Sequence, residues 1–140
     1  MPTSVQIPYL PVKNARDEIA WRPILPLTLT HQGKSLQISA LVETGADVNV
    51  LPYRVGLDLG MVWDSAGRNL ELSGNLANYE ARGVILRATI GQFLPIRLAF
   101  AWTHAENIPL LLGQMNFLIE FNVCFYSFRR FFEIHPHNEE

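Results

Sequence analysis

The sequence predicts an all-β fold, a closed or nearly closed barrel of short strands with one short helix near its C-terminus. Short apolar runs recur along the chain, and turns that contain Gly, Pro or Asn separate them at intervals of about ten residues. Only residues 114–121, directly after Gly113, are expected to be helical. The 140 residues show no internal repeat, linker or low-complexity segment, so we expect a single domain with a limited core.

The first half of the chain begins with an arm and continues with strands. Residues 1–23 contain four prolines and are predicted to form an extended N-terminal arm with little helix. The elements expected next are a strand, a polar turn with a glycine, two further strands and a helical turn, at 24–30, 31–34, 36–42, 48–51 and 55–61. The polar turn at 31–34 predicts a hairpin of the first two strands, and Pro52 ends the third strand, 48–51.

The second half is expected to consist mainly of strands, at 69–72, 79–90, 94–101, 123–128 and 130–135. The predicted helix lies between the third and the fourth of them. Residues 136–140 form a polar tail, so the folded domain is expected to span 24–135.

Composition narrows the class of protein. The chain is 49% hydrophobic and 17% charged, with a formal net charge of −2, which indicates an ordered protein and gives no sign of a nucleic-acid-binding surface. Its one cysteine, Cys124, excludes an internal disulfide and a cysteine-based zinc site. We expect no metal or other cofactor, no membrane span and no signal peptide, and hence a cytoplasmic protein.

Residues 38–52 are the most informative stretch: Ile-Ser-Ala-Leu-Val-Glu-Thr-Gly-Ala-Asp-Val-Asn-Val-Leu-Pro. An apolar strand runs directly into Glu43, which precedes Thr44-Gly45-Ala46 and a second apolar run. Such a pattern presents a carboxylate on a tight loop at the end of a buried strand. It resembles the active-site loop of the retropepsin-like aspartic proteases, in which two apolar residues precede Asp-Thr/Ser-Gly-Ala.

A second stretch strengthens the resemblance. Residues 108–118, Ile-Pro-Leu-Leu-Leu-Gly-Gln-Met-Asn-Phe-Leu, are similar to the apolar-apolar-Gly element of that family and the helix that follows it. The resemblance implies that the chain ending at Gly113 passes beside the strand that leaves the Thr-Gly loop. At that point two backbones approach too closely for a side chain. Together the two stretches resemble single-domain bacterial members of the family over residues 24–135, and imply the acid protease fold.

The resemblance also implies an activity, aspartic-type endopeptidase. Two carboxylates face each other across a water and share one proton; one acts as base while the other supports the scissile carbonyl oxygen. The sequence holds one such motif, so a homodimer would supply Glu43 from each subunit across a two-fold axis. Thr44 would brace the two loops and Gly45 would offer its amide to the substrate or the carboxylate. Ala46 and Asp47 would bind the peptide or protein substrate.

Two positions depart from the family pattern. Glu43 stands where the family has Asp, which extends the carboxylate by about 1.5 Å. A misplacement of about 1 Å can lower a rate on the order of 100-fold, so we expect weak or no cleavage. The change is either an engineered Asp-to-Glu substitution in an active enzyme or the mark of a natural pseudoprotease. Gln114 stands where retroviral relatives commonly carry Arg, which puts the usual ion pair with Asp47 in doubt.

Between the two stretches the family carries a flap that closes over substrate. Residues 73–79 fit it best, with Gly74 as the mobile point, Asn75 beside it, and Leu76 or Tyr79 as an apolar tip. The alternative is an ordinary surface hairpin.

The C-terminal run 123–134 is unusually aromatic. Strand alternation places Phe125 on one face and Tyr126 with Phe128 on the other, so apolar side chains lie on both faces. A second covering surface is implied. The resemblance places a sheet between subunits here, and a surface patch for another protein is the alternative.

Two other functions remain open. One is a catalytically dead retropepsin-fold module that binds peptides or serves only to dimerise. The other is an unrelated small β-barrel binding protein, which would be a monomer without a cleft on a two-fold axis.

Overall fold

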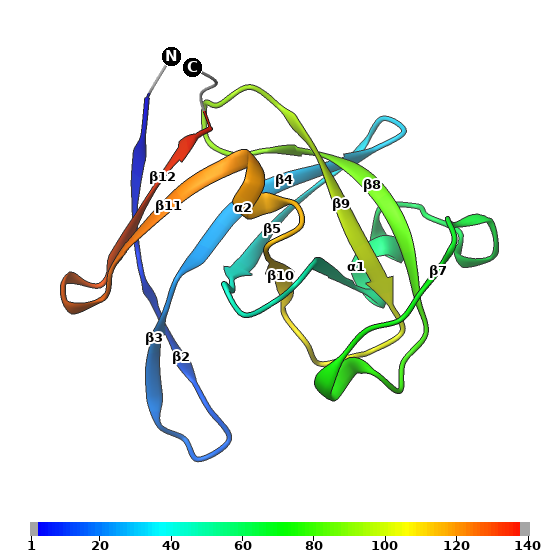
Figure 1. Ribbon diagram of the computed structural model, residues 1–140, viewed down its shortest axis with the longest axis horizontal. Coiled ribbons are helices and arrows are strands. Elements are labelled where there is room, and N and C mark those ends of the chain that lie inside the picture. The colour runs from blue at the N-terminus through cyan, green and yellow to red at the C-terminus, as the bar shows by residue number, and fades with distance from the viewer. Residues whose placement is uncertain (1–2, 138–140) are drawn as a thin grey trace.

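In the computed structural model, which describes residues 3–137, six strands close into a barrel (Figure 1). Their order around the barrel is β4 (Ile24–His31), β5 (Lys34–Val42), β10 (Leu110–Leu112), β6 (Asn49–Pro52), β9 (Ile96–Thr103) and β8 (Ala81–Thr89). Antiparallel pairing of β4 with β8 completes the circle, and β7 (Asn69–Leu70) extends β8 outward. The predicted closed barrel is confirmed.

Strand β10 lies between the two strands that flank the Thr-Gly loop. It runs parallel to β5, with Leu110 opposite Ala40, and antiparallel to β6, with Leu111 opposite Val50. The three residues of β10 are therefore surrounded by backbone on both sides, as the resemblance implied. The pairing of β10 with β5 fixes the position at which β5 ends and the loop begins with Glu43.

The barrel interior is filled by alternate residues of its strands. Leu25, Leu27 and Leu29 of β4 are buried while the residues between them are not, which is the alternation expected when one face of a strand lies on the core. Burying a leucine side chain of this kind contributes about 1.5–3 kcal/mol. The largest side chains with almost no exposed surface are Trp102, Phe100, Phe117, Phe121 and Phe132.

A separate three-stranded sheet joins the two ends of the chain. Strand β12 (Phe131–Pro136) lies between β1 (Val5–Pro8) and β11 (Phe121–Tyr126), and both pairings are antiparallel. Phe132 and Ile134 of β12 point into the core and are fully buried. Of the predicted polar tail, Pro136 belongs to β12, and 138–140 lie outside the described residues, as do 1–2 of the predicted arm.

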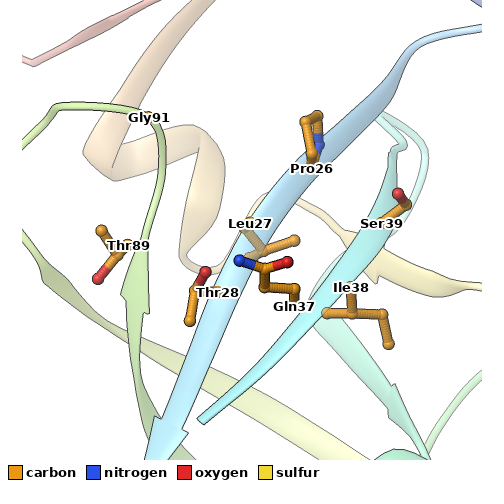
Figure 2. Close-up of a pocket in the computed structure, with 8 residues that line it drawn as sticks. All are labelled: Pro26, Leu27, Thr28, Gln37, Ile38, Ser39, Thr89 and Gly91. Atoms are coloured by element: carbon orange, nitrogen blue, oxygen red, sulfur yellow. The ribbon is translucent and has the colours of Figure 1, made fainter.

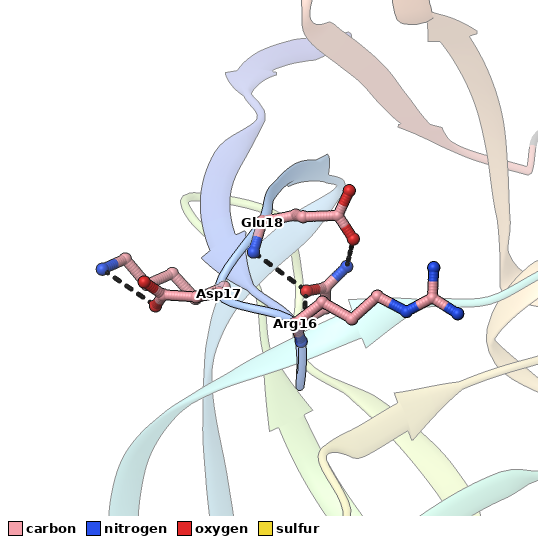
Figure 3. A network of polar contacts seen from close by, with 5 residues as sticks. Arg16, Asp17 and Glu18 are labelled. Carbon is pink, nitrogen blue, oxygen red and sulfur yellow. Dashed lines mark hydrogen bonds and ion pairs between the residues drawn. The ribbon is translucent and has the colours of Figure 1, made fainter.

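The N-terminal arm contains a hairpin that the sequence did not predict. Strands β2 (Leu10–Lys13) and β3 (Ile19–Arg22) pair only with each other and project from the barrel, at the lower left in Figure 1. Their turn contains no glycine. Instead, Asp17 adopts a positive φ of 64°, and the Asn14 side-chain oxygen accepts hydrogen bonds from the amides of Arg16 and Glu18 (2.9 and 3.0 Å; Figure 3).

Helices are short and few in the described residues. The two α-helices are α1 (Tyr53–Asp58) and α2 (Phe117–Glu120), and single 3₁₀ turns occur at η1 (Trp63–Ser65), η2 (Gly74–Leu76) and η3 (Ser127–Arg129). The helix predicted over 114–121 is thus shorter than expected, because the backbone before it bonds to the Thr-Gly loop and β11 begins at Phe121. None of the helices in residues 3–137 has the length and apolar character to cross a bilayer.

Replacing Gly56 with Ala is expected to destabilise the protein by about 1–3 kcal/mol. A β-carbon at this position in α1 would overlap the indole ring of Trp102, which is fully buried and whose Nε1 donates to the Tyr53 carbonyl (3.0 Å). That strain outweighs the roughly 1 kcal/mol by which Ala favours a helix over Gly. Urea unfolding measures the change. Asp58→Ala, on the exposed side of the same helix, is the control, and equal midpoints for the two variants would contradict the prediction.

Candidate active site

Glu43 begins the tight loop that joins β5 to β6. The Glu43 amide donates to the carbonyl of Leu112 in β10 (2.9 Å), and the Ala46 amide donates back to the Glu43 carbonyl (3.2 Å). The Glu43 side chain is half-buried, whereas Thr44 and Gly45 at the tip of the loop are exposed. Its Oε1 accepts a hydrogen bond from the Gly45 amide (2.9 Å). The longer acid therefore folds back on its own loop.

The segment after β10 holds the other side of the loop. The amides of Gln114 and Met115 donate to the carbonyls of Ala46 and Asp47 (2.9 and 3.0 Å). At Gly113 a β-carbon would lie 2.5 Å from the Ala46 carbonyl oxygen and 2.8 Å from that of Val48. The prediction that Gly113 marks a close approach of two backbones is confirmed.

Gln114 makes a second contact with the loop through its side chain. Its Nε2 donates to the carbonyl oxygen of Thr44 (2.7 Å). Within residues 3–137 the one ion pair lies elsewhere, between Lys13 and Asp17, so the exposed Asp47 has no cationic partner there. A neutral hydrogen bond from the Gln114 side chain to the backbone thus holds the loop in place.

Asn49 is a buried polar residue at the foot of the loop that sequence reasoning did not single out. It is 0% exposed; its Oδ1 accepts from the Gly113 amide (2.8 Å) and its Nδ2 donates to the Ala99 carbonyl and to Asn116 Oδ1 (2.9 and 3.2 Å). Asn116 Oδ1 also accepts from the Ala99 amide (3.0 Å). The network ties the loop to β9 and to the start of α2. An asparagine within the apolar run 48–51 was the available signal, since buried amides need partners.

A cleft of about 770 Å³ opens over the loop. Its residues come from the loop and β6, from the segment after β7, and from β10: Glu43, Gly45, Ala46, Asp47, Val48, Val50, Leu70, Glu71, Leu72, Ser73, Gly74, Asn75, Leu76 and Leu111. This volume lies within the range of about 300–1,000 Å³ typical of ligand sites. The structure therefore places most of the candidate residues around one cleft, while Thr44 and Tyr79 are not among its lining residues.

The predicted flap segment is irregular rather than a long hairpin. The strand expected over 69–72 ends at Leu70, where it pairs with Ala81, and a 3₁₀ turn follows at 74–76. Gly74 has φ of +66°, a conformation that favours glycine. Asn75 is exposed and Leu76 half-buried at the rim of the cleft, which leaves this segment facing the Glu43 loop.

Another cavity, of about 570 Å³, lies along β4 and β5, beside the end of β8. Figure 2 shows its lining: Pro26, Leu27, Thr28, Gln37, Ile38, Ser39, Thr89 and Gly91. These residues include hydroxyls and one amide but no carboxylate, imidazole or amine. Acid–base chemistry has no group to use there. A further cavity, of about 440 Å³, is lined by Arg54 and Glu106 but by no residue of the loop at 43–47. The cleft over Glu43, which also holds Asp47 and Glu71, is the candidate active site.

Two solved structures of proteases have folds similar to that of this chain. No family model and no curated protein matches the sequence. A retropepsin-like aspartic protease from Rickettsia conorii has a similar structure, with a TM-score of 0.66 and 16% identity over 95% of this chain and 90% of that one. The EIAV protease in complex with the inhibitor HBY-793 is also similar, with a TM-score of 0.50 and 18% identity over 74% of this chain and 88% of that one. The chain has the retropepsin-like fold, and the predicted fold is confirmed.

Proposed function

We propose that this chain is an aspartic-type endopeptidase that works as a homodimer, with Glu43 of each subunit supplying one member of a carboxylate pair. The observation that carries the proposal is the placement of Glu43: it lies on a loop braced from three sides, in a cleft with the flap segment opposite. The fold neighbours are proteases, which supports hydrolysis of a peptide bond as the reaction.

The need for two subunits follows from what one chain offers. Asp47 and Glu71 also line the cleft, but in the described residues neither is hydrogen-bonded to Glu43, whose recorded partner is the Gly45 amide. Two carboxylates that share a proton must lie within hydrogen-bond reach of a common water. The exposed tip of the loop at Thr44 and Gly45 leaves room for the same loop of a second copy, so a two-fold axis there would complete the pair.

The roles of the residues follow from this arrangement. One Glu43 would take a proton from the water while the other, protonated, donates to the scissile carbonyl oxygen. Thr44 would contact the partner loop, and the Gly45 amide would hold the carboxylate. Ala46 and Asp47 would bind the substrate backbone from below, and the flap residues Gly74, Asn75 and Leu76 would cover it.

Peptide cleavage tests the proposal. A mixed peptide library is incubated with the wild-type chain between pH 4 and 7 and read by mass spectrometry. We expect slow cleavage whose specific rate falls on dilution, as two subunits make one site, and none with Glu43→Gln, which cannot act as a base. Cleavage by the Gln variant would refute the proposal, and so would a wild type that cuts at the same specific rate when it is monomeric by light scattering.

A second candidate function is a dimeric peptide-binding or dimerisation module without catalysis. It is favoured by the hydrogen bond from the Gly45 amide to Glu43, because this bond turns the carboxylate toward its own loop. The module would be dimeric and would not cleave peptides, whether position 43 is Glu or Asp.

A further inference from the structure

The hairpin β2–β3 exposes apolar side chains on both of its faces. In the register of its strands, Leu10 and Val12 lie on one face and Ile19 and Trp21 on the other, and all four are exposed, Ile19 to 60%. An isolated two-stranded hairpin is at best marginally stable in water, and apolar patches of this kind mark interaction surfaces. Within the described residues, the strands of the hairpin pair only with each other.

The base of the hairpin lies next to the candidate active site. Directly after β3, the carbonyl of Pro23 accepts a hydrogen bond from the amide of Val42 (3.0 Å), the residue before Glu43. On the other strand, the Tyr9 amide donates to the carbonyl of Arg130 (2.7 Å), and the guanidinium of Arg130 lies 4.2 Å from the ring centroid of Trp21. The base of the hairpin therefore lies between the Glu43 loop and the turn that joins β11 to β12.

The exposed surface continues onto that turn. Tyr126 is exposed and Phe128 is 100% exposed, while Phe125 packs toward Phe132 in the core. Ser127, between the two exposed aromatics, is 3.3 Å from the Tyr9 hydroxyl at the hairpin base. The turn therefore adjoins the base of the hairpin. We call the exposed apolar residues of the hairpin and the turn together the clasp surface: Leu10, Val12, Ile19, Trp21, Tyr126 and Phe128.

We propose that the hairpin β2–β3 clasps a second copy of this chain. The inference rests on the proposed function: if a two-fold axis passes between the two Glu43 loops, the hairpin base, one residue from Glu43, lies beside that axis. Each hairpin strand of four residues extends about 13 Å further from the base. Its free end then reaches the partner subunit, where the apolar side chains of the clasp surface are buried against the second copy.

The balance of charges at the tip of the hairpin favours a second copy of the chain over a highly charged partner. The tip of the hairpin carries Lys13, Arg16, Asp17 and Glu18, two cations and two anions, and Lys13 pairs with Asp17 at 3.3 Å. The other cations near the hairpin, Arg22 and Arg130, lie at its base, so a nucleic acid or a strongly acidic peptide would meet no excess of positive charge at the tip. An apolar surface with a neutral tip suits another apolar protein surface.

The test is the dimer dissociation constant, measured by analytical ultracentrifugation. Val12→Asp combined with Ile19→Asp is expected to raise it roughly a hundredfold, because buried apolar anchors dominate such interfaces. The matched control is Ile85→Asp combined with Leu94→Asp, two exposed apolar residues on the barrel, which should leave it unchanged. Circular dichroism verifies that both variants keep the fold.

Hydrogen exchange of the wild type gives a second measurement that needs no variant. The amides of Leu10, Val12 and Lys13 and those of 19–22 should exchange more slowly at dimer concentrations than in the dilute monomer; Pro11 has no amide hydrogen. Equal exchange, or a folded clasp variant that dimerises as tightly as wild type, would overturn the clasp and leave the proposed function standing. A wild type that stays monomeric at high concentration would overturn both.

Discussion

Replacing Glu43 with Asp is expected to raise the rate of peptide cleavage by about 100-fold, because each of the two carboxylates moves back by roughly one bond length. In the wild type the extra methylene lets the carboxylate fold onto the Gly45 amide. Two such groups facing each other across an axis leave less room for the attacking water. The shorter side chain restores that space without changing the charge of the site.

The measurement is the cleavage rate of one library peptide by the wild type and by Glu43→Asp at equal dimer concentration. Glu71→Asp removes the same methylene from another acid that lines the cleft and is the matched control; its rate should equal that of the wild type. If Glu43→Asp is no faster than a wild type that cuts, Glu43 is a working catalytic acid in its present position. If neither cuts while both are dimeric, the binding-module function is correct.

Replacing Asn49 with Leu is expected to lower the free energy of unfolding by about 3–5 kcal/mol. Leucine has a similar size but no polar side-chain atoms, so the Gly113 amide and the Ala99 carbonyl lose their hydrogen bonds to the side chain. Asn116 Oδ1 loses its bond from Asn49 and keeps the one from the Ala99 amide. Each buried group left unsatisfied costs about 1–3 kcal/mol.

Thermal unfolding checks this prediction, and a decrease in Tm of about 10–17 °C corresponds to such a loss in a chain of this size. Asn122→Leu, on the exposed side of β11, is the control and should change Tm little. An unchanged Tm in Asn49→Leu would mean that the network does not hold the loop to β9.

Local patterns in the sequence predicted most of the barrel. Alternating apolar residues in 24–30 and 36–42, with a glycine turn between them, were enough for the first hairpin. Two backbone features of the fold, the Thr-Gly loop and the close approach at Gly113, each depend on a small residue that is visible in the sequence. Where a turn with a glycine joins two alternating runs, the prediction was correct.

The errors have two physical causes, one local and one of longer range. The hairpin β2–β3 has a turn built by the Asn14 side chain in place of glycine, and Pro11 argued against a strand; at the edge of a two-stranded sheet, proline is tolerated. The helix over 114–121 was predicted too long because the partners of Gln114 and Met115 lie about 70 residues earlier in the chain.

The candidate site was predicted in its parts but not in its geometry. The sequence indicated the loop residues and a candidate flap segment. In the structure one cleft is lined by Glu43, Gly45, Ala46 and Asp47 and by the predicted flap residues around Gly74. Asn49 escaped notice because its importance comes from Ala99 and Asn116, which are brought to it only by the fold.

The hydrogen bond from the Gln114 side chain to the Thr44 carbonyl depends on neither pH nor salt. Neither the side-chain amide nor the backbone carbonyl gains or loses a proton between pH 4 and 7, and salt does not screen a neutral hydrogen bond as it screens an ion pair. Acidification that protonates the carboxylates therefore leaves this support intact. This contact therefore holds the tip of the loop independently of acidity and ionic strength, whereas the bond from the Gly45 amide to the Glu43 carboxylate involves a group that can be protonated.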